Sequence, residues 1–496
     1  MPRNNYLLSL LPDARSLGLF RIFLGFSFLY SLIVVKWPSI PDFWGSHPII
    51  PTDIMSHLCA GGSGISIFSY IHSDGFAYFF FGLAILSSIS LILGYYSSIA
   101  AWLCLFFHWN IVQAYAAFAF GFDLFLFQLL FWSCFLPLDS EFAIRRATKP
   151  ILWTWFALLL LLQITWIYFS TGMSKYGNSW MEGYAVRNML MDYWGATNFG
   201  KSIGNNELFY RSTTYISLTV ERFFPLLVFL KPSSKWLRLI LVLFLFLFHL
   251  SIAVTYDVAN FSITGLAVAA FFIPGPWWDK LKIKLNNSMD VRMNWPFQGW
   301  KNYALRGFVI VAAFIICQKN IFFLLKHSSL RTNLKFQSKI EGLLKLDIPS
   351  PLPVSFFWQY WKMFSPNPPA NGGWIALEEL RDDGSIVEFF SKKLVEEKAK
   401  MLWKPNGLDF YLFYYARSVD INDPKELKFK LFLKYWLKRK LNQLPEKEVK
   451  NIFLTNYLVI IANQKRLSNM VVQRRIFSVS KFLNTKDPYS SDNKIK

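Results

Sequence analysis

Ionisable side chains interrupt the apolar stretches of this 496-residue chain, and these positions are where chemistry is to be expected. A charge in an apolar environment is costly, so it persists where it pairs, binds or transfers protons. Lys175, Asp123 and His249 are the candidate catalytic residues, because an amine, a carboxylate and an imidazole can each accept and release a proton. Glu221 and Arg21 are expected to be structural, Glu221 by bridging helices and Arg21 by extending to lipid phosphate.

Each polar residue also has a structural interpretation. Glu221 and Arg222 are neighbours and cannot pair on one helical face, so each needs a partner on another helix. A lone histidine such as His249 is more often a hydrogen-bonded core residue than a catalyst, and His108 is interpreted as structural. Lys175 could equally extend to the membrane interface as an anchor.

Metal chemistry is not expected. The four cysteines, Cys59, Cys104, Cys134 and Cys317, form no C-x-x-C pair. Three of them lie within or beside apolar stretches, which leaves no disulfide framework and no metal site.

The composition indicates a membrane protein. The chain is 54% hydrophobic and 19% aromatic, with a mean hydropathy of +0.30, which is too apolar for an ordinary soluble fold. Apolar runs such as 151–170 approach the roughly 20 residues that a helix needs to cross a bilayer. We therefore predict an all-α polytopic membrane helix bundle of about nine helices. The predicted spans are 16–36, 76–96, 98–118, 121–138, 151–170, 211–231, 236–255, 259–275 and 304–325.

The third and fourth spans could form one kinked element, and the eighth is short enough to be re-entrant. The bundle is assigned to residues 1–325, followed by a small extracytoplasmic α+β domain at 326–484 and a disordered tail at 485–496. Nothing near the N-terminus resembles a cleaved signal peptide, so we expect the first span to be retained.

Lysine and arginine set the expected orientation, because short cytoplasmic loops are enriched in them. Residues 37–75 contain neither lysine nor arginine, which places that loop outside. The N-terminus is then cytoplasmic and the C-terminal domain extracytoplasmic. The basic residues of the loops assigned to the cytoplasm are Arg145, Arg146, Lys149, Lys231, Lys235, Lys280, Lys282, Lys284, Arg292 and Lys301.

The net charge of +21 is explained largely by these loops beside anionic headgroups, so membrane lipids are expected partners and nucleic acid is not. The basic run at 434–440 is interpreted as a solvated helix face.

The C-terminal region changes in character. Residues 374–390 alternate around Asp383 and Gly384, which predicts a β-hairpin. Asp423 and Pro424 are expected to open an amphipathic helix that reaches about Leu441. Two later stretches, 452–461 and 471–479, are candidate strands.

A set of motifs follows one order along residues 10–280. The segment YFSTGMSKYGNSWMEG (168–183) is joined by LFRIFLG (19–25), LPLDSEFAI (136–144), TVERFFP (219–225) and His249 with FFIP (271–274). This set resembles the HTTM (horizontally transferred transmembrane) domain proteins of the vitamin K-dependent gamma-carboxylase-like superfamily. The proline- and aromatic-rich WQYWKMFSPNPP before the hairpin resembles the tail of many bacterial members.

The resemblance implies a role for Lys175, which matches the lysine taken to deprotonate a reduced quinone similar to vitamin K. Oxidation of that quinone by O₂ yields a base able to remove a proton from carbon. A lysine serves in this way only where apolar surroundings populate its neutral amine. Tyr168, Tyr176 and Trp180 are the candidate cofactor-binding residues around it.

This sequence differs from the carboxylase pattern in two ways. Asp123 stands near the place of a family histidine, and the C-terminal region is much smaller than the one that grips a propeptide. Glutamate carboxylation of a protein substrate is therefore not expected. Two hypotheses remain: a quinol-coupled, proton-abstracting membrane enzyme acting at the extracytoplasmic side, or a non-catalytic scaffold or maturation partner for an exported peptide or lipid.

Overall fold

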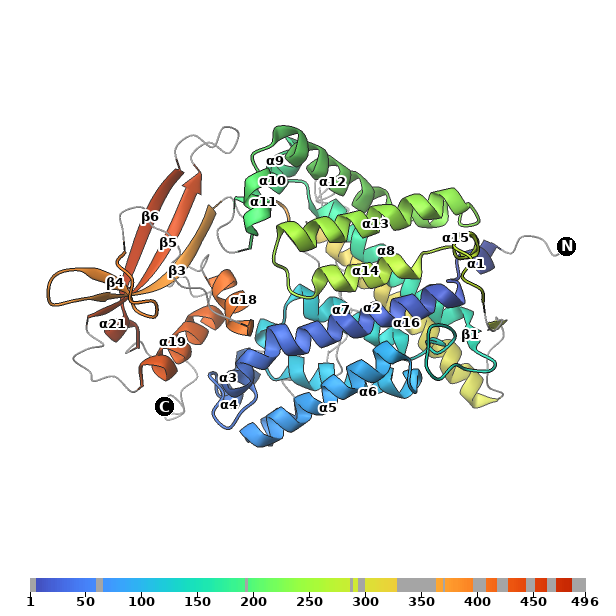
Figure 1. Ribbon diagram of the computed structural model, residues 1–496, viewed down its shortest axis with the longest axis horizontal. Coiled ribbons are helices and arrows are strands. Elements are labelled where there is room, and N and C mark those ends of the chain that lie inside the picture. Colours follow the sequence, from blue (N-terminus) through green and yellow to red (C-terminus); the bar gives the residue numbers. More distant parts are fainter. Residues whose placement is uncertain are drawn as a thin grey trace.

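The computed structural model describes most of the chain, in eleven segments. These are residues 6–58, 66–191, 195–285, 289–292, 299–327, 363–368, 371–395, 407–416, 427–442, 451–461 and 470–483. Within them the fold is a helical bundle joined to a smaller domain that carries a four-stranded sheet (Figure 1).

Each predicted span overlaps a helix of at least 11 residues. These helices are α2 (Ala14–Tyr30), α5 (Asp74–Leu93), α6 (Ser97–Gln113), α7 (Gly121–Ser133), α8 (Thr154–Ser174), α12 (Glu207–Phe229), α13 (Lys235–Thr255), α14 (Phe261–Phe271) and α16 (Trp300–His327). The first span continues from α2 through a π-helix, η1 (Ser31–Lys36), and a 3₁₀ turn, η2 (Trp37–Ser39), into α3 (Ile40–Phe43).

Five helical stretches of the described chain are long and apolar enough to cross a membrane. They are Tyr6–Phe43, Asp74–Leu93, Thr154–Ser174, Lys235–Thr255 and Trp300–Gln318, while α7 and α14 are apolar but shorter. The expectation of a polytopic helical membrane protein is confirmed at this level.

Side-chain caps set where several of the long helices begin. Ser73, Asn206 and Ser234 each accept a hydrogen bond from a backbone N–H of the first turn, at the starts of α5, α12 and α13. The helix α5 ends at Gly94, whose φ of +72° is a left-handed conformation that favours glycine. The boundaries therefore follow from local sequence as well as from packing.

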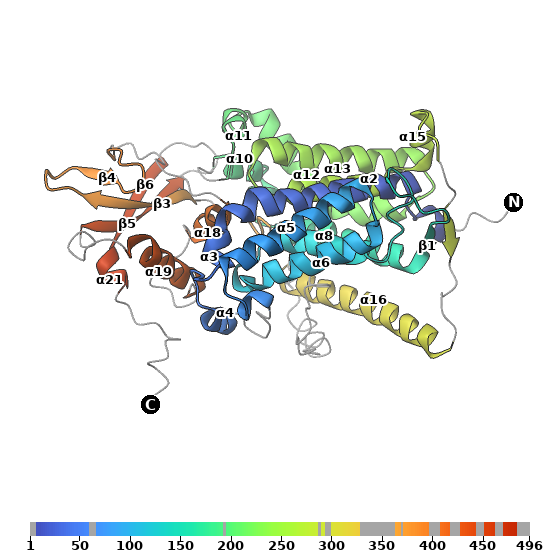
Figure 2. The ribbon, with the colours of Figure 1, turned by 60° about the horizontal axis from the view of Figure 1, so that its bottom comes forward.

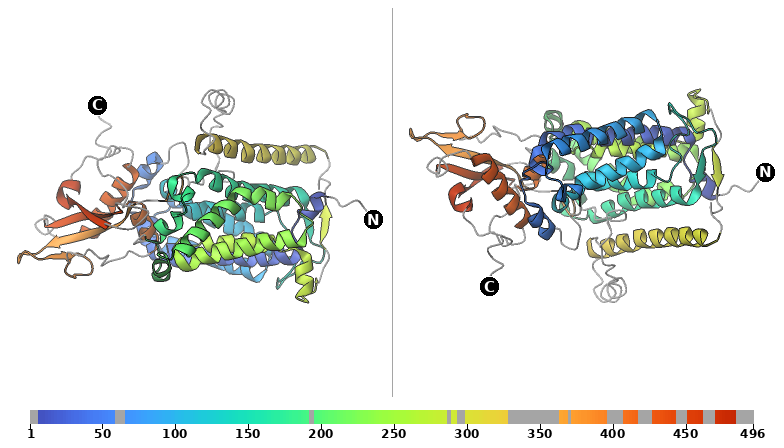
Figure 3. Two further views of the ribbon diagram at one scale, coloured as in Figure 1. Left: turned by 90° about the horizontal axis from the view of Figure 1, so that it is seen from above. Right: turned by 90° about the horizontal axis from the view of Figure 1, so that it is seen from below.

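The helix α2 runs through the middle of the bundle and packs against α14, α5 and α7. On one side α12 packs against α8, and α13 packs against α14. The helix α16 runs along the outside, beside α8, as the turned views show (Figures 2 and 3). Short elements join the long helices: α1 (Tyr6–Ser9), α4 (Thr52–Leu58), α9 (Asn178–Met181), α10 (Ala185–Leu190), α11 (Asn198–Ile203), α15 (Gly275–Lys280), β1 (Ile151–Trp153) and β2 (Asp290–Arg292).

The C-terminal region contains an antiparallel sheet in the order β4-β3-β5-β6. The predicted hairpin is confirmed as β3 (Asn371–Leu380) and β4 (Ile386–Glu388), and the two candidate strands as β5 (Ile452–Ile461) and β6 (Met470–Ser478). The amphipathic helix is α19 (Leu427–Leu441), accompanied by α18 (Gly407–Ala416) and α21 (Val479–Leu483). Asp423, Pro424 and the tail at 485–496 lie outside the described residues.

This region docks on the end of the bundle formed by η2 and α3. The backbone N–H of Leu408 donates to Oγ of Ser39 over 3.0 Å. Nε of Arg439 lies 3.0 Å from Oδ1 of Asp42. The N-terminus lies at the opposite end of the bundle (Figure 1).

Candidate functional site

Lys175 lies at the C-terminal end of α8, where unsatisfied carbonyls are expected. The guanidinium of Arg222, on α12, satisfies two of them by donating to the carbonyls of Gly172 (3.1 Å) and Lys175 (2.9 Å). A side chain at Gly172 would meet the backbone N of Arg222 at 2.8 Å. Glycine there lets α8 and α12 approach closely enough for both contacts.

The same approach places the side chain of Lys175 against Glu221. Nζ of Lys175 donates to both carboxylate oxygens of Glu221, at 2.7 and 2.6 Å. Both side chains are buried, with 4% and 3% of their residues' surface exposed. The amine also lies 4.6 Å from the ring centre of Trp180, so the cation meets an aromatic face as well as a carboxylate.

A cavity opens beside this ion pair. It encloses about 1010 Å³ of space, part of it continuous with the outside, and its lining is mainly apolar. Lys175 and Glu221 are its ionisable lining residues, and Tyr168, Trp180, Phe248 and Phe364 are among its aromatic ones. A mainly apolar pocket with a few convergent polar groups is the usual form of a small-molecule site.

A second buried contact supports the wall of this cavity. The hydroxyl of Tyr168 lies 2.7 Å from Nε2 of His249, and the Tyr168 ring stacks on Phe224 with ring centres 4.5 Å apart. Among the described residues, Nδ1 of His249 has no hydrogen-bond partner. The ring of His249 packs against Gly265, where a Cβ would lie 2.1 Å away.

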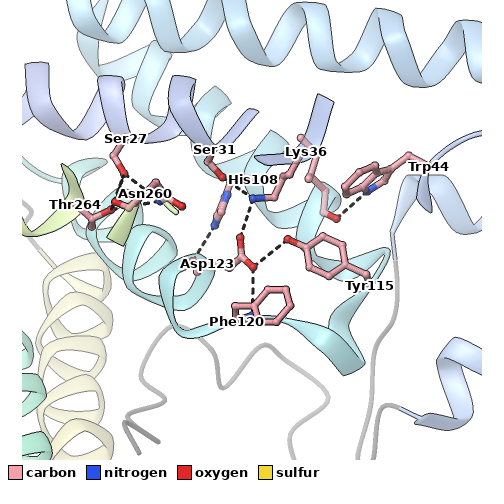
Figure 4. Close-up of polar contacts among 11 residues, drawn as sticks. Ser27, Ser31, Lys36, Trp44, His108, Tyr115, Phe120, Asp123, Asn260 and Thr264 are labelled. Atoms are coloured by element: carbon pink, nitrogen blue, oxygen red, sulfur yellow. Dashed lines mark hydrogen bonds and ion pairs between the residues drawn. The ribbon is translucent and has the colours of Figure 1, made fainter. Parts of the chain in front are cut away.

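Asp123 belongs to a different network, shown in Figure 4. Its Oδ1 accepts a hydrogen bond from Nζ of Lys36 (2.8 Å), and its Oδ2 accepts from the hydroxyl of Tyr115 (3.0 Å) and the backbone N–H of Phe120 (3.2 Å). Lys36 also donates to Oγ of Ser31, one π-helical turn earlier. Lys36 and Asp123 are both fully buried.

The structure therefore divides the expected catalytic residues. We also predicted that Lys175 lies in a cavity, within hydrogen-bonding reach of another polar group such as Asp123 or His249; the structure places it in a cavity, and that polar group is Glu221. Asp123 pairs with Lys36 instead. His249 does not line the cavity but contacts Tyr168, which does. The prediction that Glu221 and His249 are buried and bonded across helices is confirmed.

The candidate cofactor-binding residues also separate. Tyr168 and Trp180 line the cavity. Tyr176, although next to Lys175, is not among the lining residues. Within 168–180 the lining residues are Tyr168, Thr171, Lys175 and Trp180, and the first three are spaced three and four residues apart, as on one face of a helix.

Arg21 does not extend to lipid phosphate. Its side chain is fully buried, and Nη2 donates to the carbonyl of Phe142 over 2.6 Å. The contact places the guanidinium beside Gly94, where no side chain would fit. The expected structural role stands, but the arginine holds a loop against α2 instead of reaching the membrane surface.

Sequence reasoning did not find Lys36, Arg222's role at the end of α8, or Phe364. The signal for Lys36 was available, since it is a cation ending a span on the side whose loop, 37–75, has no lysine or arginine. Phe364 had no such signal, because its place against Trp180 depends on a contact across 184 residues of chain.

Within the part of the chain that the structure describes, no group of histidine, cysteine, aspartate and glutamate side chains could hold a metal ion. Comparison of the chain with protein-family models, with curated proteins and with solved structures gave no match.

Proposed function

We propose that this chain is an integral membrane enzyme with a carboxylase-like, quinol-coupled site at Lys175, as the resemblance to HTTM domain proteins implies. The observation that carries the proposal is the buried Lys175–Glu221 pair lining a mainly apolar cavity. A structural ion pair has no need of adjacent space. The proposal includes about nine spans, a cytoplasmic N-terminus and an extracytoplasmic C-terminal domain.

The cavity residues fit a reduced quinone. Flat aromatic side chains, Trp180 and Tyr168, line the space, and the ion pair offers one donor and one acceptor at its polar end. Such a ring would supply, on oxidation by O₂, a base strong enough to remove a proton from carbon. The substrate would be a lipid, a peptide or an exported protein.

Lys175 and Glu221 would act as a unit. If Glu221 takes the shared proton, the amine of Lys175 becomes neutral and can accept a proton from a ring hydroxyl. The pair would then hold two protons, one on Glu221 and one on the Lys175 ammonium, and the ring oxyanion would balance the added charge; the carbonyl oxygen of Glu221 can still accept a hydrogen bond from the ammonium. Trp180 provides a π-face for the same cation.

The test is oxygen consumption by the full-length protein in lipid nanodiscs, supplied with reduced 2-methyl-1,4-naphthoquinone. We expect consumption above the protein-free rate for the wild type and loss of that excess in Lys175→Arg, because a guanidinium stays protonated at any accessible pH. Lys280→Arg, at an exposed lysine in α15, is the matched control and should retain it. Equal rates in wild type and Lys175→Arg would refute the catalytic role.

A non-catalytic scaffold is the alternative, and the Lys36–Asp123 network favours it. That network shows that this bundle does hold a buried lysine–carboxylate pair for packing. If Lys175 were only an anchor of this kind, neither the wild type nor Lys175→Arg would consume oxygen above the protein-free rate, so the same assay separates the two functions.

A further inference from the structure

A short piece of the C-terminal region borders the Lys175 cavity. We call residues 363–367 the strap. It touches the segment that follows α8 through four hydrogen bonds, which are Gly177 N to Pro366 O (2.9 Å), Ser179 N to Asn367 Oδ1 (2.9 Å), Ser365 Oγ to Ser174 O (2.7 Å) and Trp180 Nε1 to Phe364 O (2.9 Å).

The segment after α8 is shaped to receive the strap. A side chain at Gly177 would meet the side-chain amide of Asn367 at 2.1–2.3 Å, so the close contact requires a residue without Cβ. Trp180 is 2% exposed, and its indole N–H has the Phe364 carbonyl as its acceptor. The strap therefore fixes the ring that also contacts the Lys175 amine.

Two strap side chains, Met363 and Phe364, line the cavity itself. The ring of Phe364 meets that of Tyr256 edge-on, with centres 5.7 Å apart. Phe364 has a φ of +57°, a left-handed conformation that costs a bulky residue energy and is held here by its contacts. The strap thus forms a wall of the cavity, next to the sheet domain that starts at Asn371.

The wall on the other side is built differently. Ser217 on α12 and Ile252 on α13 line the cavity and are partly exposed. The residues outside them are large, apolar and open, with Ile216 53% and Leu247 60% exposed. The helix α13 is long and apolar enough to cross a membrane, and lipid would cover an exposed apolar surface on it, so the side of the cavity formed by α12 and α13 is the one that would face the bilayer.

We propose that the strap shuts the Lys175 cavity off from water while the gap between α12 and α13 admits ligand from the bilayer. The ligand class is a membrane-dissolved amphiphile whose polar ring end meets Lys175 and Glu221 and whose apolar chain lies along α12 and α13. The identity of the ring rests on the proposed function, but the route does not. Phe364 is then a positioning residue that separates the reacting end from water.

Cysteine labelling tests the route without turnover. Thr171, a buried lining residue on α8, is replaced by cysteine in a background with Cys59, Cys104, Cys134 and Cys317 changed to alanine. The full-length protein in nanodiscs is treated with N-ethylmaleimide, which partitions into lipid, or with a charged trimethylammonium thiosulfonate, which does not. We expect labelling by the first reagent only.

Three added substitutions separate the contributions of the strap from those of α12 and α13. Phe364→Ala should raise labelling by the charged reagent at least tenfold, and Asn367→Ala, which removes one strap contact, should raise it less. Ile252→Trp should slow the lipid-soluble reagent by narrowing the gap. Phe223→Ala, at an aromatic residue of α12 that is 54% exposed, is the control and should change neither rate.

The proposal would be overturned if the charged reagent rapidly labelled Thr171→Cys while the strap was unaltered. Unchanged labelling rates in Phe364→Ala, Asn367→Ala and Ile252→Trp would also overturn it. The result is independent of the oxygen-consumption assay. A protein that labels as expected but consumes no oxygen refutes the proposed chemistry alone, and the reverse outcome refutes the route alone.

Discussion

Two buried lysine–carboxylate pairs in one bundle have different surroundings. Lys36 and Asp123 are fully buried, and Asp123 has further donors in Tyr115 and Phe120. In the described hydrogen bonds, the Glu221 carboxylate accepts from Lys175 and from no other side chain. Both residues line a cavity. One lysine–carboxylate pair is therefore enclosed by packed side chains, and the other borders a cavity.

Because both pairs are buried, burial of charge alone does not identify a functional site. Removing a buried charge from water is costly in both places, and each pair meets the cost with short hydrogen bonds. What distinguishes the Lys175 pair is adjacent space that a ligand could fill. The predictions below compare the two pairs, beginning with the largest effect.

Breaking the Lys36–Asp123 pair should have the largest effect on the free energy of unfolding. Lys36→Met leaves the Asp123 carboxylate buried without its cation, which should cost about 3–5 kcal/mol of unfolding free energy. The measurement is denaturant unfolding in mixed micelles. The double variant Lys36→Met with Asp123→Leu should recover much of the loss, and no recovery would show that the pair is not the source of the effect.

A third carboxylate, Asp409 on α18, has no cation bonded to it in the described contacts and should make stability depend on pH. Burial, helped by repulsion from Asp42, raises the pKa of Asp409 to about 7 from 3.8, although Lys440 and Arg439 oppose this. The folded protein then binds more protons than the unfolded chain between these values, so stability falls as pH rises from about 4 through 7.

Over this pH range, the free energy of unfolding should fall by at most about 1.4 kcal/mol per pH unit because of Asp409. Asp409→Asn should flatten it, as measured by unfolding midpoints at pH 5 and pH 8. An equally steep slope in that variant would assign the pH dependence to another group.

Breaking the Lys175–Glu221 pair should cost less stability than breaking the Lys36–Asp123 pair. In Lys175→Met the Glu221 carboxylate still has the Arg222 guanidinium as a neighbouring cation, so the expected loss is about 1–3 kcal/mol. Oxygen consumption should disappear in the same variant. A loss of stability as large as that of Lys36→Met would place both pairs in the structural class.

The smallest effect is expected at the supporting contact. Tyr168→Phe removes the hydroxyl that bonds His249 and should lower the unfolding free energy by about 1 kcal/mol. If His249 only supports the wall, quinol oxidation should persist in this variant with a modest change in KM. A fall in its maximal rate to that of Lys175→Arg would make Tyr168 part of the reaction.

The helices could be predicted because apolar runs and capping residues are local signals. Ser73, Asn206 and Ser234 precede helices that begin within a few residues of the predicted positions. The hairpin could also be predicted, since alternation around Asp383 and Gly384 specifies it without reference to the rest of the chain.

The partners of the ionisable residues could not be predicted in this way. Lys175, Asp123 and His249 were grouped because their side chains can accept and release protons, yet residue type says nothing about which faces of helices oppose each other. Glu221 reaches Lys175 because Gly172 lets α12 approach α8, a packing detail that hydropathy does not carry. The strap could not be predicted for the same reason, since its side-chain hydrogen bonds join residues that lie 184 to 191 positions apart in the chain.

The most direct test of the account is a density map of the full-length protein purified from its own membrane without added ligand. The account predicts planar, ring-shaped density beside Lys175, Glu221 and Trp180, with apolar chain density continuing between α12 and α13, and none beside Lys36. A map with clear side chains in which the cavity holds only water, or is filled by collapsed side chains, would contradict it.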